Sequence, residues 1–155
     1  ETVKAARTKF WETLATVVRE KRYYLEPSIA IEKLSAVYSA GMDLENTTII
    51  ADENGVITRV EVDHLKPDLE NYYFGGGVFF EYVSHDLTDI SDLLTDKYQT
   101  LTYYGLDPGS IADQVLESGA RGIDRIVPVG RSSEFGLVWD GYDLIRSMAR
   151  HVIVA

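Results

Sequence analysis

The stretch VFFEYVSHDLTDISDLLTDKYQTLTYYG, residues 78–105, decides the fold class that we expect for this chain. Residues 78–83 are rich in Val, Phe and Tyr and predict a strand, and residues 99–104 predict a second strand that ends at Gly105. Between the two strands, residues 86–95 predict a helix. Its apolar side chains recur at helical spacing and are Leu87, Ile90, Leu93 and Leu94.

The same alternation continues along the chain. Residues 108–118 predict a helix capped by Asp107, and residues 123–129 predict a third strand. Strands that alternate with helices through short links are typical of a right-handed parallel α/β unit. We therefore expect a β-α-β-α-β parallel unit within residues 72–155, with a segment from Tyr142 onward that is helical at first.

The first part of the chain, residues 1–46, predicts a pair of helices. Apolar residues recur at helical spacing from residue 3 to about residue 24, and good helix formers fill the other positions. Pro27 suits the first turn of a second helix, and Gly41 is a suitable end for it.

Residues 47–62 predict a strand pair, because two β-rich runs flank the turn sequence DENG at residues 52–55. The helical pair, the strand pair and the parallel unit together predict an α/β fold class. The 155 residues fit a single α/β domain of ordinary size.

Composition excludes several function classes. Hydrophobic residues make up 45% of the chain, which is enough for a core, but no run reaches the ~18 apolar residues of a membrane span. The net charge of −10 disfavours nucleic acid as a partner, because phosphate backbones are repelled. The chain has no cysteine, so no thiolate nucleophile or disulfide lies within it.

Motifs for self-contained catalysis are missing as well. His64, His85 and His151 do not have metal-ligand spacing, and we expect no metal site. No serine lies in a nucleophile elbow, so we assign no catalytic residue to this chain. The glycine run at residues 75–77 precedes a strand rather than a helix, which favours a tight turn over a phosphate cradle.

Four polar and aromatic residues surround one glycine near the end of the chain, in the segment GARGIDRIVPVGRSSEFGLVWDGYDLI (residues 119–145). They are Trp139, Asp140, Tyr142 and Asp143. Such a cluster is either a packed turn or the edge of a pocket, and the sequence leaves both interpretations open. In the second, Asp140 and Asp143 fix the loop through backbone N–H groups.

Three runs in this region resemble the bacterial long-chain acyl-CoA reductase (LuxC-type) family, which supplies fatty aldehyde for luminescence. They are YQTLTYYG (residues 98–105), GIDRIVPVG (residues 122–130) and WDGYDLI (residues 139–145). Together they cover most of residues 98–145, whereas the first 70 residues match more loosely. That family is similar in fold to aldehyde dehydrogenases, and we expect this chain to resemble the C-terminal part of their catalytic domain.

The resemblance implies a site for NADPH. Aldehyde dehydrogenases carry a Glu-Ile-Phe-Gly-Pro segment whose Glu binds the nicotinamide ribose and whose Phe lies near the ring. Phe74 and Gly75 match that segment, Tyr72 falls on the Glu position, and Gly76 replaces the Pro. We therefore expect Tyr72, Phe74 and Gly75 to be cofactor-binding residues, with most of the NADPH site formed upstream of this chain.

For the substrate, the resemblance implies reduction of an acyl-CoA or acyl-protein thioester to an aldehyde through a cysteine acyl-enzyme. The cysteine lies outside these residues, so we expect the chain to be the C-terminal portion of a longer cytoplasmic, homo-oligomeric reductase that is inactive alone. We expect a substrate-binding loop after the third strand of the parallel unit. Its residues are Arg131, Trp139, Asp140 and Tyr142.

A second function class stays open. The strand pair at residues 47–62 can serve a non-enzymatic module that oligomerises or binds a partner by adding strands to a neighbouring sheet.

Overall fold

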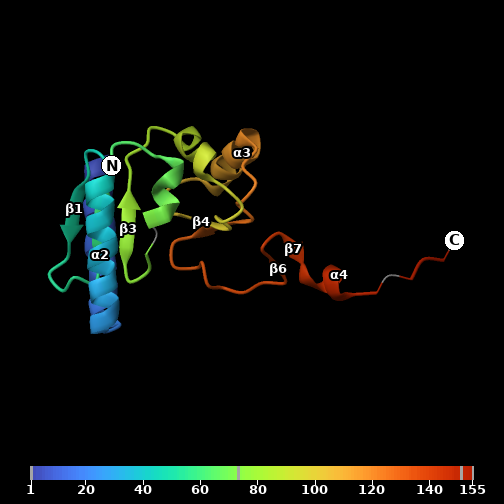
Figure 1. The fold of residues 1–155 in the computed structure, drawn as a ribbon. Coiled ribbons are helices and arrows are strands. Elements are labelled where there is room, and N and C mark those ends of the chain that lie inside the picture. Colours follow the sequence, from blue (N-terminus) through green and yellow to red (C-terminus); the bar gives the residue numbers. More distant parts are fainter. Residues whose placement is uncertain (1, 73, 151, 155) are drawn as a thin grey trace. The chain divides into compact units, whose positions relative to one another are not determined.

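The computed structural model describes residues 2–72, 74–150 and 152–154. The chain has a mixed α/β fold with small sheets, as the sequence predicts at the level of class (Figure 1). It divides into two compact units, unit 1 (Glu1–Val83) and unit 2 (Ser84–Ala155).

Unit 1 begins with the predicted helical pair. Helix α1 spans Val3–Glu20, and helix α2 spans Pro27–Asp43 with its proline in the first turn. The expected end at Gly41 is wrong, since α2 continues to Asp43. A side chain at Gly41 would place its Cβ 3.0 Å from the side chain of Ile49, so this glycine permits a close approach to the sheet rather than ending the helix.

The predicted strand pair is confirmed. Strand β1 (Thr48–Ala51) pairs antiparallel with β2 (Thr58–Glu61), and α2 runs alongside the sheet (Figure 1). In the turn, the Gly55 N–H donates to the Asp52 carbonyl at 3.0 Å. A short 3-10 helix, η1 (Pro67–Tyr72), then leads to β3 (Val78–Glu81), which pairs parallel with β2.

This pairing corrects the predicted β-α-β-α-β unit. Its first strand, β3, belongs to a sheet of order β1-β2-β3, where the Thr58 N–H donates to the Gly77 carbonyl at 2.8 Å. Strands β4 (Thr100–Tyr103) and β5 (Arg125–Pro128) form a separate parallel pair in unit 2. Helix α3 (Pro108–Ser118) connects them and packs against β5, so the β-α-β motif is confirmed only for β4-α3-β5.

The helix expected at residues 86–95 is a 3-10 helix, η2 (Leu87–Leu93). Short polar side chains fix the start of this helix, because they bond to one another and to the nearby backbone. The Asp86 carboxylate accepts from the Thr88 N–H at 2.6 Å, and Ser84 donates to the Asp89 carboxylate at 2.6 Å.

Unit 2 ends in a small hairpin and a short helix. Strands β6 (Val138–Trp139) and β7 (Tyr142–Asp143) pair antiparallel, and α4 (Leu144–Met148) follows directly. The Asp143 carboxylate caps α4 by accepting from the Arg146 N–H at 3.0 Å. The helical start predicted from Tyr142 therefore begins at Leu144.

A buried lysine ties together three segments of unit 1. Lys33 on α2 is 3% exposed, and its ammonium donates to the carbonyls of Gly55, Val56 and Gly76 at 2.8, 2.9 and 3.0 Å. Three acceptors match the three N–H groups of a protonated lysine. Burial lowers the pKa of Lys33, and the negative charge of Asp52 acts in the opposite direction.

Replacing Lys33 by methionine keeps the side-chain length but leaves three carbonyls without their donor. We expect Lys33→Met to lower the free energy of unfolding by about 3 kcal/mol, the order found when a buried charged partner is removed. Urea unfolding followed by circular dichroism measures the change. Lys9→Met, on the exposed face of α1, is the matched control and should leave stability unchanged. Equal stability of the two variants would contradict the role of Lys33.

Candidate functional site

Arg125, at the start of β5, organises the loop that follows this strand. Its guanidinium donates to the carbonyls of Ser132 and Glu134 at 3.0 and 2.9 Å. The same guanidinium lies 4.2 Å from the centre of the Trp139 ring, which is cation–π geometry. One side chain therefore holds both the start of the loop and the aromatic residue near its end.

The Trp139–Tyr142 cluster is a tight two-residue hairpin. Asp140 and Gly141 form its turn with φ values of 48° and 76°, and Trp139 pairs with Tyr142 across it. A Cβ at Gly141 would lie 2.7 Å from a carboxylate oxygen of Asp124, so this side chain lies directly against the turn. The glycine is favoured here by the left-handed backbone of the turn.

The structure brings the expected substrate-binding residues onto one loop of unit 2. Trp139 and Asp140 are half-buried, whereas Tyr142 is 67% exposed. Arg131 is exposed and forms an ion pair with Glu134 at 2.6 Å. Hydrogen bonds to Glu134 raise the pKa of Arg131 and lower that of Glu134.

Sequence reasoning missed three members of this cluster: Asp124, Arg125 and Phe135. The Phe135 ring lies 5.1 Å from that of Trp139 and is 70% exposed, so the cluster has an outer aromatic face. The available signal was the Asp-Arg pair at the start of an apolar strand, since charged residues there need partners.

The expected cofactor-binding residues lie in unit 1. Tyr72 ends η1, packs against the Ala40 and Leu44 core, and donates its hydroxyl to the Asp43 carboxylate at 3.3 Å. Phe74 is half-buried, and a Cβ at Gly75 would meet open space. Nothing in the structure tests their assignment to the cofactor, and it stays a prediction.

The next two glycines are required by packing within unit 1. Gly76 and Gly77 have φ values of 62° and 78°, and a Cβ at Gly77 would lie 2.1 Å from the Val56 carbonyl oxygen. A Cβ at Gly76 would lie 3.3 Å from Ile29. These contacts fit the tight turn that the sequence favours.

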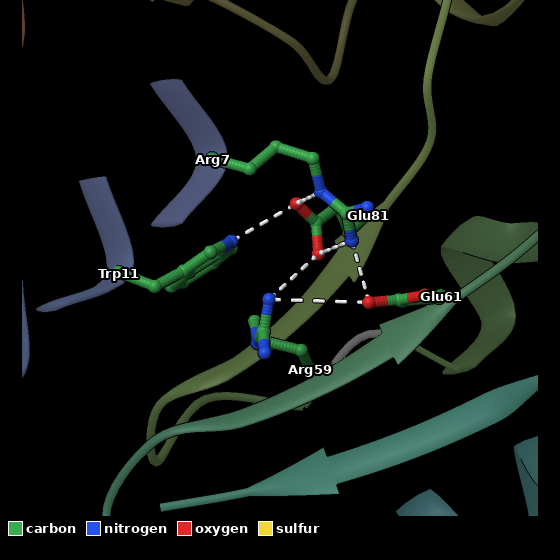
Figure 2. A network of polar contacts seen from close by, with 5 residues as sticks. All are labelled: Arg7, Trp11, Arg59, Glu61 and Glu81. Carbon is green, nitrogen blue, oxygen red and sulfur yellow. Dashed lines mark hydrogen bonds and ion pairs between the residues drawn. The ribbon is translucent and has the colours of Figure 1, made fainter. Parts of the chain in front are cut away.

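The largest charged cluster is also in unit 1 (Figure 2). Arg7 bonds to both oxygens of Glu81 at 2.7 and 2.9 Å and to Glu61 at 2.5 Å, and Arg59 bonds to Glu81 at 3.2 Å. The Trp11 ring N–H donates to Glu81 at 2.9 Å. Glu61 and Glu81 are neighbours in the β2–β3 register, so arginine is needed between them.

This cluster clamps α1 to the sheet. Its four charged groups bond to one another, which ties residues of α1, β2 and β3 together. Burial acts to raise the pKa of Glu81, but hydrogen bonds from Arg7 and Trp11 outweigh it and hold the pKa below its ordinary value. Hydrogen bonding to Glu81 likewise raises the pKa of Arg7.

A lowered pKa in the folded state means that ionised Glu81 stabilises the fold above its ordinary pKa of 4.5. That stabilisation is lost as the pH falls through the folded-state pKa. We expect Glu81→Gln to cost about 2 kcal/mol at neutral pH and to flatten the acid limb of stability against pH. Urea unfolding between pH 3 and pH 7 measures this. Glu117→Gln, at an exposed position on α3, is the control and should keep the wild-type acid limb. An acid limb in Glu81→Gln as steep as that of the wild type would refute the clamp.

Neither a metal-ligand cluster nor a membrane-spanning helix is found among the described residues. No group of three or more His, Asp or Glu side chains there is placed to hold a metal ion. His64 and His85 belong to no such group, and His151 lies outside the described residues. None of the described helices combines the length and the apolar character needed to cross a bilayer.

Comparison with protein-family models, curated proteins and solved structures gave no match to this chain. A function can therefore be proposed only from the chemistry of the Arg125 loop and from the resemblance of its motifs to acyl-CoA reductases.

Proposed function

We propose that this chain is the C-terminal segment of an acyl-CoA reductase, an NADPH-dependent cytoplasmic enzyme that reduces a fatty acyl thioester to the aldehyde. The observation that carries the proposal is the contact between two motifs that are separate in the sequence. Arg125 lies over Trp139, and Asp124 meets Gly141. The runs GIDRIVPVG and WDGYDLI thus meet in one interlocked loop, which supports their interpretation as one site.

In this proposal the loop provides binding surface rather than reactive groups. It follows the carboxyl end of β5, the position at which open α/β sheets bind ligands. Trp139 and Tyr142 would line the path of the acyl chain. Arg131 is exposed at the start of the loop and would leave its ion pair with Glu134 to bind a phosphate of CoA.

The reacting atom belongs to sequence outside these residues. A cysteine thiolate attacks the thioester carbonyl, forms an acyl-enzyme and releases CoA. NADPH would supply the hydride that yields the aldehyde. Tyr72, Phe74 and Gly75 would contact the nicotinamide side of the cofactor, as the resemblance implies. Without the cysteine, the 155 residues alone should have no reductase activity.

Trp139→Ala in the full enzyme tests whether the loop binds substrate. We expect kcat/KM for a long-chain acyl-CoA to fall about tenfold or more, or ~1.4 kcal/mol, with an unchanged melting temperature. NADPH oxidation and aldehyde formation measure activity. Leu116→Ala, at an exposed position near the end of α3, is the control and should retain full activity. Parallel loss of activity and stability in Trp139→Ala would show that the side chain only packs the loop.

Assembly is a second candidate function, and a stripe on α2 favours it. Four apolar residues at helical spacing are each more than half exposed, namely Ile31, Leu34, Tyr38 and Met42. In addition, β1 is an edge strand with one neighbour in its sheet, so its outer side can accept another strand. Both features suit a homo-oligomer.

Light scattering coupled to size exclusion tests assembly. We expect the particle in solution to have a mass that is a multiple of the mass of one chain. Tyr38→Glu should shift it to the monomer, because a buried unpaired charge opposes association. Tyr104→Glu is the control with the same change outside the stripe. A wild-type chain that is monomeric at every concentration would contradict this candidate.

A further inference from the structure

Unit 1 contains a cavity of about 650 Å³ between the end of α1, the helix α2 and the β1–β2 hairpin. This volume is within the range of roughly 300–1,000 Å³ that is usual for small-molecule sites. Apolar side chains from all three elements line it, among them Val18, Leu25, Ala30, Leu34 and Val56. The cavity is separate from the Arg125 loop, which belongs to unit 2.

The charge of the cavity is opposite to that of the chain. Arg19, Arg22 and Lys33 line it, and none of its lining residues is an Asp or a Glu. The whole chain, in contrast, has 25 acidic and 15 basic residues. The nearby carboxylate of Asp52 accepts from the Ile57 N–H at 2.9 Å and is not part of the lining.

The three cations differ in what they already bind. The ammonium of Lys33 donates to three carbonyls, and Arg19 donates to the Thr16 hydroxyl at 3.0 Å. Arg22 has no hydrogen bond or ion pair from its guanidinium to any residue that the structure describes. Its five donors are therefore available to a ligand that enters the cavity.

The backbone at Arg22 supports a functional reason for this residue. Helix α1 ends in a Schellman motif, in which the Arg22 N–H donates to the Arg19 carbonyl at 3.0 Å and the Tyr23 N–H to the Val18 carbonyl at 3.1 Å. The residue in the left-handed position of this motif is usually glycine, yet Arg22 occupies it with φ 55°. The Arg22 guanidinium has no polar partner among the described residues that would account for an arginine at this position, which favours a ligand.

We propose that this cavity binds a small aromatic anion, a planar ring system with a carboxylate or a phosphate. Arg22 would hold the anionic group through paired N–H bonds, with Arg19 beside it. The rings of Tyr23 and Tyr24 also line the cavity and are largely exposed, so they offer faces for stacking. This site does not depend on the proposed reductase function, because it uses other residues in the other unit.

Isothermal titration calorimetry of the chain with naphthoate, naphthyl phosphate and naphthylmethylammonium tests the site. We expect one bound anion per chain and no binding of the cation. The anion that binds with the higher affinity shows whether the site prefers a carboxylate or a phosphate. Failure of all three probes to bind, or equal binding of the cation and the anions, would overturn the proposal.

Arg22→Gly separates ligand binding from folding. Glycine relieves the left-handed backbone, so the melting temperature should stay the same or rise, while the affinity for the anion falls at least about tenfold. Asn46→Gly is the matched control: Asn46 also has a positive φ, 54°, in unit 1, but it does not line the cavity. An unchanged affinity in Arg22→Gly, or an equal loss in Asn46→Gly, would overturn the assignment of Arg22.

Discussion

The buried ammonium group of Lys33 is the constraint on which the architecture of unit 1 depends. It connects α2 to the β1–β2 turn and to the glycine run before β3 through three carbonyl groups. These bonds hold Gly76 and Val56 close together, and the neighbouring Gly77 then has no room for a Cβ. The parallel pairing of β2 with β3 starts at this point, with the bond from Thr58 to Gly77. The same lysine contributes to the wall of the cavity at the end of α1.

Arg125 has an equivalent role in unit 2, because it also uses a cation to gather backbone carbonyls. It holds the loop after β5 and supports the Trp139 ring. In both units, then, a cation is bound by the backbone rather than by one of the many carboxylates. Such a group fixes a loop without a second charged side chain.

Features that depend on local chemistry could be predicted from the sequence. The helical pair, α3 with its Asp107 cap and the strand pair around the DENG turn all follow from patterns within a few residues. The partner of β3 could not be predicted, because it is decided by Gly77 lying against Val56, some twenty residues earlier. The sequence shows the residues of the compact turn at Asp140 and Gly141 as a cluster. It does not mark Lys33 and Arg125 as the residues that hold loops in place. Their partners are carbonyl groups, which every residue carries, so no residue type in the sequence marks the contact.

We propose above all that this chain belongs to a reductase whose nucleophilic cysteine lies outside it. The most direct test is the intact mass of the native protein isolated from its source, measured before and after alkylation with iodoacetamide. The claim predicts a mass several-fold above the 17.4 kDa of this chain, with at least one alkylated cysteine. A native mass equal to that of the chain, with no alkylation, would contradict it and would leave assembly and anion binding as the functions that the structure supports.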